Sequence, residues 1–225
     1  MKRLVLFVEG EGDESAVPVI VRRVLRELDA WDCLFLDPRP FKVGEVNRLF
    51  KEDYHNWLRW LGAAAKRRDI GAILLVLDGD SRKVGGQEFC AAKVARKLAL
   101  ASARARGGEL FSVATVFACQ EFESWLIAGV ESLAGERLKD GRVGVKAGTQ
   151  PPETNLELSP RDAKRWLSRA MESGYSAAKD QAELTAMVDL SLIRNRPMRS
   201  FVRLESALST IVQAIQDDSH VVSPS

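Results

Sequence analysis

The sequence predicts an α/β protein in which a parallel sheet is covered by helices on both faces. Two observations support this prediction. Short apolar segments rich in β-branched residues show no alternation of polar and apolar positions, which is typical of strands buried on both faces. These segments alternate along the chain with longer stretches that carry apolar residues at helical spacing, as expected of parallel strands joined by helical crossovers.

The first half of the chain contains three of the expected strands and two of the expected helices. The strands are short apolar runs, at Arg3–Val8, Cys33–Leu36 and Ala72–Leu77. A helix is expected over Asp13–Leu28, because Asp13, Glu14 and Ser15 form a capping cluster before an apolar stripe. A second, longer stripe predicts a helix over about Gly44–Arg68.

The second half begins with the same alternation and then changes. A third helix is expected over Gln87–Arg106 and a fourth strand over Leu110–Ala118. Residues 131–160 are rich in Gly, Pro and charge, which predicts a loop or insertion. From Ser159 onward helical patterns return, and the last residues, DDSHVVSPS, are expected to fray. We therefore expect an α/β domain at 1–130, the insertion at 131–160 and a helical part at 161–225 that packs on the same domain.

Composition narrows the class of protein. The chain has 225 residues, 46% of them hydrophobic, so it can bury a sizeable core. Its net charge of +2 lies far from the strongly basic balance of a nucleic-acid coat, and any nucleic-acid contact should use a local patch. Three cysteines far apart fit a reducing compartment, and the apolar run IGAILLVL is too short to cross a membrane. We expect a cytoplasmic protein without membrane contact.

Acidic residues follow two of the predicted strands. The first strand runs into VEGEGDE, which holds Glu9, Asp13 and Glu14, and the third ends in LDGD, which holds Asp78 and Asp80. Ligands of open α/β sheets lie beyond the carboxyl ends of the strands, so neighbouring strands would bring these acids together. Two unit charges about 5 Å apart repel by roughly 3 kcal/mol at an effective dielectric near 20, and several such pairs would recruit a cation. Oxygen ligands without histidine suit Mg²⁺ or Mn²⁺.

A third acidic segment, EFESWL, follows the fourth strand. Glu121 and Glu123 are two residues apart and are not expected to face the same way, so one would join the metal site while the other meets solvent. Each acid also has a simpler explanation. Asp13 and Glu14 could serve only the helix dipole, the DGD segment could be a common turn, and Glu121 and Glu123 could start a helix. Their combination in one sheet favours a site.

At these residues the sequence resembles the TOPRIM domain, a Rossmann-like metal fold in which one strand ends in Glu and a later strand in DxD. The opening VEGEGDESAVP is similar to the OLD-family nucleases, with Glu9, Asp13 and Pro18 at the matching places. Asp13 stands where Glu is more common, and Glu14 is the alternative ligand. The chain looks closest to small stand-alone bacterial TOPRIM-like proteins classed as a domain of unknown function, which share VEG, LDxD, EFExWL and a helical C-terminal part.

The resemblance implies a nuclease that depends on a divalent metal, Mg²⁺ or Mn²⁺, and hydrolyses DNA or RNA, with a role in phage defence. Glu9, Asp78 and Asp80 would be catalytic, and the full set of expected metal ligands is Glu9, Asp13, Glu14, Asp78, Asp80, Glu121 and Glu123. The phosphate backbone would contact basic residues after the DGD segment and before the last helix, namely Arg82, Lys83, Arg196 and Arg199. Relatives lie beside ATPases, which implies an ATPase partner, and a homodimer is left open.

Three alternatives remain from the sequence. A non-catalytic regulatory subunit of a neighbouring ATPase would keep the metal site for structure. A haloacid-dehalogenase-type phosphatase would use the first Asp of LDGD as its nucleophile, but it needs a later Lys and a further acidic pair on another strand end. The pair Asp217–Asp218 lies in the tail, and Glu9 would be idle. A topoisomerase needs a nucleophilic tyrosine, for which the candidates, Tyr54 and Tyr175, both lie in helix-like segments.

Overall fold

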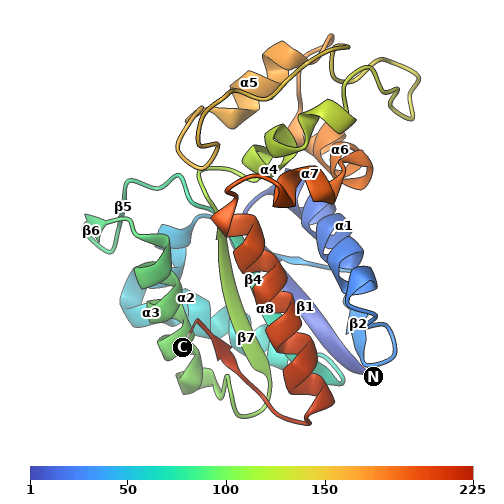
Figure 1. The fold of residues 1–225 in the computed structure, drawn as a ribbon. Helices are drawn as coiled ribbons and strands as arrows, with labels where there is room; N and C mark the ends of the chain where they lie inside the picture. The colour runs from blue at the N-terminus through green and yellow to red at the C-terminus, as the bar shows by residue number, and fades with distance from the viewer. Residues whose placement is uncertain (225) are drawn as a thin grey trace.

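The computed structural model describes residues 1–224, and within them one sheet of six strands forms the centre of the molecule (Figure 1). The strand order is β2-β1-β4-β7-β8, with β3 also paired to β1, and the pairings between these strands are parallel. The strands are β1 (Lys2–Val8), β2 (Leu34–Leu36), β3 (Phe41–Lys42), β4 (Ile70–Asp78), β7 (Ser112–Ala118) and β8 (Val222–Ser223). The predicted α/β class is confirmed.

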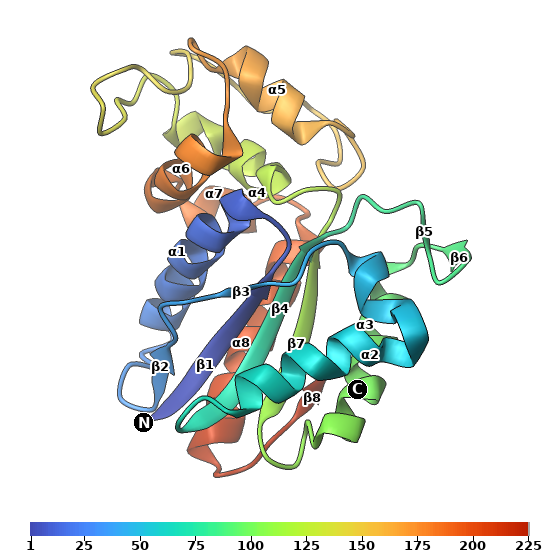
Figure 2. The ribbon, with the colours of Figure 1, turned by 180° about the vertical axis from the view of Figure 1, so that it is seen from behind.

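Helices cover both faces of the sheet. Figures 1 and 2 show α1 and α8 on one face and α2 and α3 on the other. The α-helices are α1 (Glu11–Glu27), α2 (Val46–Ala65), α3 (Ala91–Ser102), α4 (Glu123–Ala128), α5 (Ala163–Ala170), α6 (Ala182–Met187), α7 (Leu190–Arg194) and α8 (Arg199–Gln216). Short 3₁₀ turns, η1 (Ala103–Ala105) and η2 (Val130–Ser132), and a π turn, η3 (Ala177–Gln181), complete the helical elements of the described residues.

The alternation of side chains along β1 explains why the strand is apolar throughout. Leu4 and Leu6 belong to the core beneath α1 and α8, whereas Val5 and Phe7 belong to the core beneath α2 and α3. All four side chains are fully buried. Burying one such side chain stabilises a fold by about 1.5–3 kcal/mol, so the central strands hold the two helical layers together.

The register of the sheet brings the carboxyl ends of β1, β4 and β7 to one edge. Val8 pairs with Val76, and Asp78 pairs with Ala118. Beyond this edge lie α4, α5, α6 and α7, seen at the top of Figure 1. The acidic segments therefore meet beneath a layer of helices rather than in open solvent.

Two predicted helices differ from the structure. The helix expected over Gly44–Arg68 is interrupted at Lys51–Tyr54, where three residues have left-handed φ angles of 49°, 51° and 66°. Apolar side chains on both sides of the break keep helical spacing, so periodicity does not reveal it. The helix expected from Gln87 begins at Ala91, because Lys83–Glu88 forms a small hairpin, β5 (Lys83–Val84) and β6 (Gln87–Glu88), around Gly85 and Gly86.

The prediction that the tail frays is wrong for its central part. Val222 and Ser223 form β8 and pair with Val113 and Ala114 of β7. The pairing completes a sheet edge, and the hydroxyl of Ser223 also accepts a hydrogen bond from Arg203 on α8. Ser225 lies outside the described residues.

The segment 133–162 consists of turns and isolated bridges, yet it contributes to the core. Leu133, Leu138, Val145 and Leu156 are buried in the cluster that also contains residues of α1 and α8. The C-terminal helices join the same cluster through Leu184, Val188 and Phe201, among others. Among residues 1–224, no helix is both long enough and apolar enough to cross a membrane.

Candidate metal centre

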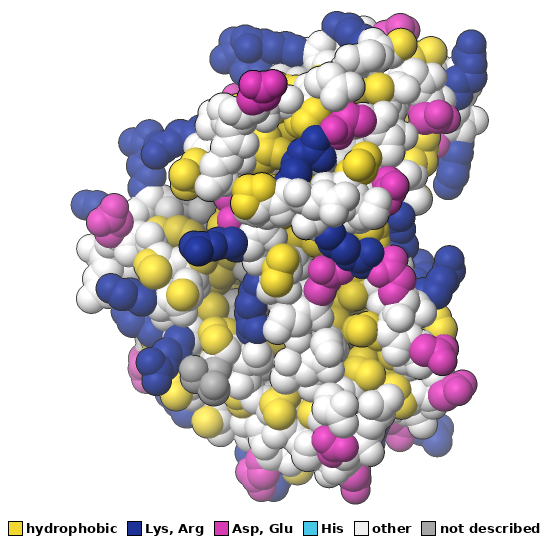
Figure 3. Space-filling view, in the orientation of Figure 1, with side chains coloured by type: hydrophobic (Ala, Val, Ile, Leu, Met, Phe, Trp, Pro, Cys, Tyr) yellow, Lys and Arg dark blue, Asp and Glu magenta, His cyan; other side chains and the backbone are white. Residues whose placement is uncertain are grey.

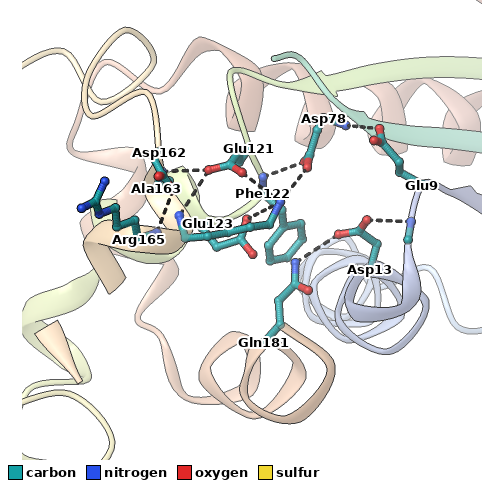
Figure 4. Close-up of polar contacts among 12 residues, drawn as sticks. Glu9, Asp13, Asp78, Glu121, Phe122, Glu123, Asp162, Ala163, Arg165 and Gln181 are labelled. Atoms are coloured by element: carbon teal, nitrogen blue, oxygen red, sulfur yellow. Dashed lines mark hydrogen bonds and ion pairs between the residues drawn. The ribbon is translucent and has the colours of Figure 1, made fainter. Parts of the chain in front are cut away.

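Glu9 and Asp78 meet at the carboxyl edge of the sheet. The backbone N–H of Asp78 donates a hydrogen bond of 3.2 Å to Oε2 of Glu9, a contact drawn in Figure 4. The contact exists because β1 and β4 are neighbours in register, so the residues that follow them are held side by side. The spatial convergence that the sequence implied for these two residues is confirmed.

Asp78, Glu121 and Glu123 form the tightest acidic cluster. Each offers a carboxylate oxygen, and the three oxygens lie within 4.8 Å of one another. All three side chains are buried, Glu123 completely. Such a set of hard oxygen ligands could bind a divalent metal ion.

The expectation that Glu121 and Glu123 face opposite ways is wrong. Glu123 is the first residue of α4, whereas Glu121 precedes the helix and follows Gln120, which has a left-handed φ of 66°. The rule that residues two apart diverge holds only inside a regular helix or strand. Here the turn between β7 and α4 directs both carboxylates inward, and the backbone N–H of Phe122 between them donates to Oδ1 of Asp78 at 2.9 Å.

A lysine that sequence reasoning missed lies among the three acids. The Nζ of Lys164 donates to Oε1 of Glu121 at 2.9 Å and to Oδ2 of Asp78 at 3.3 Å, and it lies 3.8 Å from Oε2 of Glu123. The start of α5 supports this arrangement, because the backbone N–H groups of Ala163 and Lys164 both donate to Oε2 of Glu121. Lys164 thus partly neutralises a buried cluster of three acids.

The two carboxylate oxygens of Glu123 differ in their hydrogen bonding. Its Oε1 accepts a hydrogen bond of 2.8 Å from the hydroxyl of Tyr175. Its Oε2 is buried and has no hydrogen-bond partner among residues 1–224. A buried carboxylate oxygen without a donor is costly, and a metal ion would satisfy it.

Burial and mutual repulsion shift the protonation of the cluster. Burial raises the pKa of Glu9 to about 7, with the charges of Asp80 and Asp13 adding to the effect. Burial likewise raises the pKa of Glu123 to about 7, and it raises the pKa of Asp78 well above its ordinary value. Burial by itself would lower the pKa of Lys164, but the charges of Asp78 and Glu123 more than offset this effect and raise that pKa. The lysine is therefore charged at neutral pH.

The remaining predicted acids lie at the rim of the centre or outside it. Asp13 accepts hydrogen bonds from the backbone of Gly10 and the side chain of Gln181, and its charge raises the pKa of Asp78. Asp80 is exposed as a residue, yet partial burial of its carboxyl group raises its pKa. The nearby charge of Glu121 raises this pKa further. Glu14 is exposed on α1, where it lies 3.9 Å from Lys42.

The predicted basic residues fall into two groups. Arg82 and Lys83 line a cavity of about 940 Å³ that Asp80 also borders. Arg196 instead donates to the backbone oxygen of Ala128 and pairs with Glu131, and Arg199 lines a different cavity.

The residues that complete the centre come from the helical C-terminal part. Lys164 belongs to PRDAKRWL, and Tyr175 and Gln181 belong to GYSAAKDQAELT. Their polar character within amphipathic helical segments gives no sign that they point inward. The N-cap Asp162, which accepts from the backbone N–H of Arg165, signals the start of α5 but not what α5 contacts.

Comparison with known proteins gives one match. The model of the family described as Domain of unknown function (DUF4276) matches residues 8–209, which include all the acids of the centre and Lys164. No curated protein and no solved structure matches the chain. The match spans most of the chain, and the protein belongs to the DUF4276 family.

Proposed function

We propose that this protein is a TOPRIM-like nuclease that hydrolyses phosphodiester bonds of DNA or RNA with the help of Mg²⁺ or Mn²⁺. The observation that carries the proposal is the buried cluster of Asp78, Glu121 and Glu123 beside Glu9 at the carboxyl edge of a parallel sheet. That edge is where open α/β sheets bind ligands, and hard oxygen ligands suit these cations.

Each group has a role that its position supports. Asp78, Glu121 and Glu123 would hold the cation, which when bound polarises a phosphoryl oxygen and makes bound water more acidic. Glu9, whose pKa burial raises to about 7, is suited to move a proton near neutral pH. Lys164 would donate to a phosphate oxygen, and Arg82 and Lys83 beside Asp80 would hold the phosphate backbone.

The substitution Asp78→Asn tests the proposal. An Asn side chain can still accept the hydrogen bond from the backbone of Phe122, so the fold should persist while the charge is lost. We expect cleavage of plasmid or single-stranded nucleic acid in Mn²⁺ to fall by at least about 100-fold. Asp69→Asn, at an exposed site after α2, is the control. Unchanged cleavage by the Asp78 variant would end the assignment.

A second candidate function is favoured by Lys164. Because the ammonium group contacts all three acids, the cluster could be a structural ion-pair network in a non-catalytic subunit of an ATPase. Calorimetric titration with Mn²⁺ separates a nuclease centre from a metal-free ion-pair network, whereas a non-catalytic subunit with a structural metal site would bind Mn²⁺ and cleave nothing. A nuclease centre should bind Mn²⁺ and lose binding in Asp78→Asn, whereas a purely structural network should bind none.

The alternatives that use a protein nucleophile receive less support. Burial and the charge of Glu123 raise the pKa of Tyr175, which disfavours the phenolate that a topoisomerase requires. A haloacid-dehalogenase-type enzyme would leave Glu9 idle, although Glu9 contacts Asp78, while Lys164 beside Asp78 would be the later lysine that it needs. Trapping with beryllofluoride separates this alternative from the nuclease.

A further inference from the structure

A cavity of about 800 Å³ opens between α3, the later part of β7 and the start of α8. Its walls are mainly apolar and include Ala92, Ala95 and Phe117. β8 pairs with β7 near its start, at Val113 and Ala114, and the cavity borders the later residues Thr115 and Phe117. The size falls within the range of small-molecule sites.

Some polar groups of this cavity lack a matching partner, whereas its buried acid, Glu157, accepts a hydrogen bond from the backbone N–H of Ser200. Thr115 is 1% exposed, and its hydroxyl has no hydrogen-bond partner among residues 1–224. Arg199 and Arg203, one turn apart on α8, also line the cavity, and neither forms an ion pair with a described acid. The guanidinium of Arg203 donates to the hydroxyl of Ser223, and burial lowers its pKa. A half-buried cation without an acid is a site for an anion.

The cavity adjoins the one beside Asp80 and shares part of its lining. Cys119, Glu157 and Leu158 line both, and the second cavity carries the basic side chains of Arg82, Lys83 and Arg161. Leu158, which lines both cavities, is an apolar side chain that is 66% exposed. Figure 3 shows basic and hydrophobic side chains close together between the β5–β6 hairpin and the start of α8.

We propose that the cavity receives one nucleotide unit, whose base lies between the apolar walls and whose phosphate faces Arg199 and Arg203. The inference rests on the proposed function, because the basic side chains of Arg82, Lys83 and Arg161 in the adjoining cavity beside Asp80 are what favour a strand with repeated phosphates. The hydroxyl of Thr115 contacts the base edge, and Leu158 packs on the base at the mouth of the cavity. A base that enters such a cavity must leave its stack, so a single strand is preferred over a duplex.

Two substitutions test the cavity without disturbing the core. Ala92 is exposed on α3, so Ala92→Trp narrows the cavity from its solvent side, and Leu100→Trp on the exposed face of the same helix is its control. Arg199→Ala removes an exposed cation from the cavity, and Arg96→Ala, exposed on α3, removes the same charge elsewhere.

Binding is measured by fluorescence anisotropy of a labelled single-stranded oligonucleotide in EDTA, so that no cleavage is needed. We expect Ala92→Trp and Arg199→Ala to weaken binding about tenfold or more, with the controls within about twofold of the unmodified protein. A matched duplex should bind more weakly than the single strand. Titration with adenosine monophosphate tests whether the cavity takes a free nucleotide or only a nucleotide within a strand. A cavity for free nucleotides would bind adenosine monophosphate alone, whereas a cavity for strand units would not.

Equal binding by all variants, or binding of neither strand nor nucleotide, overturns the inference. Cleavage assays in Mn²⁺ distinguish failure of the nucleotide-cavity inference from failure of the nuclease assignment. If Ala92→Trp and Arg199→Ala cleave with unchanged kcat and KM, the cavity is not a substrate site although the nuclease stands. If the two variants lose oligonucleotide binding while the unmodified protein cleaves nothing in any divalent metal, the binding cavity is supported and the nuclease assignment is wrong.

Discussion

At the scale of single residues, Lys164 determines the charge balance of the centre. It reaches three buried carboxylates with one ammonium group, so when all three are ionised the cluster carries a net negative charge even with the lysine in place. An excess of buried negative charge is unfavourable unless it is protonated or paired. The centre is therefore prepared for a second cation.

Removing the lysine should show that the stability of the fold depends on a cation among the acids. We expect Lys164→Met to lower the free energy of unfolding in EDTA by about 1–3 kcal/mol, because the acids lose a hydrogen-bonded cation. Mn²⁺ should restore much of the loss. Urea denaturation measures both, with Lys93→Met, exposed on α3, as the control. Equal stability of Lys164→Met and the unmodified protein in EDTA would contradict this role.

The raised pKa of Glu123 predicts a pH dependence of metal binding. A carboxyl group must release its proton before it binds a metal ion. Since burial raises the pKa of Glu123 to about 7, the group is protonated below that pH, and Mn²⁺ affinity should fall as pH is lowered through about 7. Calorimetric titrations at several pH values measure the trend. In Glu123→Gln the affinity should be weaker and should vary less over the same interval.

At the scale of elements, the start of α1 packs tightly against η3. A Cβ atom on Gly12 would lie 2.1 Å from Oε1 of Gln181 and 2.8 Å from Cβ of Ala177. The same Gln181 donates to Asp13 at the rim of the centre. Gly12 thus allows two distant segments to approach each other.

Gly12→Ala should therefore destabilise the fold. Overpacking of this kind costs about 1–3 kcal/mol, and we expect Mn²⁺ affinity to fall as well, because α1 and Asp13 must shift. Gly62→Ala is the matched control, since nothing lies within 4 Å of its added Cβ and alanine is the better helix former in α2. Urea denaturation of both variants measures the difference, and similar stabilities would refute the tight contact.

Elements also show where local patterns mislead. Helical periodicity continues through the break at Lys51–Tyr54, because the apolar side chains of the two pieces pack on the same core. The hairpin around Gly85 and Gly86 carried a usable signal, two glycines between short segments, that the helix prediction overrode. The pairing of Val222 with β7 depends on an open sheet edge and has no local signature.

At the scale of the whole molecule, the acidic cluster connects segments far apart in the chain. Asp78 ends β4, Glu121 and Glu123 lie at the start of α4, and Lys164, which joins them, lies in the first turn of α5. A ligand that binds only this folded arrangement stabilises it by mass action, by about 2.7 kcal/mol at a hundredfold excess over Kd.

Saturating Mn²⁺ should raise the thermal unfolding midpoint of the protein by several degrees, by about 2–4 °C for each kcal/mol at this chain length. The gain should disappear in Asp78→Asn. Differential scanning calorimetry with and without Mn²⁺ measures it, with K⁺ at matched ionic strength as the control. An equal gain in Asp78→Asn would place the bound ion elsewhere.

The sequence by itself determined the parallel sheet and the acids at its carboxyl edge. Both follow from local features, since buried parallel strands are apolar throughout and the residues after neighbouring strands must meet. The tertiary structure alone decided that Lys164 enters the acidic cluster and that both Glu121 and Glu123 face it. Those outcomes depend on how α5 packs against the turn before α4, and contacts of such long range leave no periodic trace in the residues that make them.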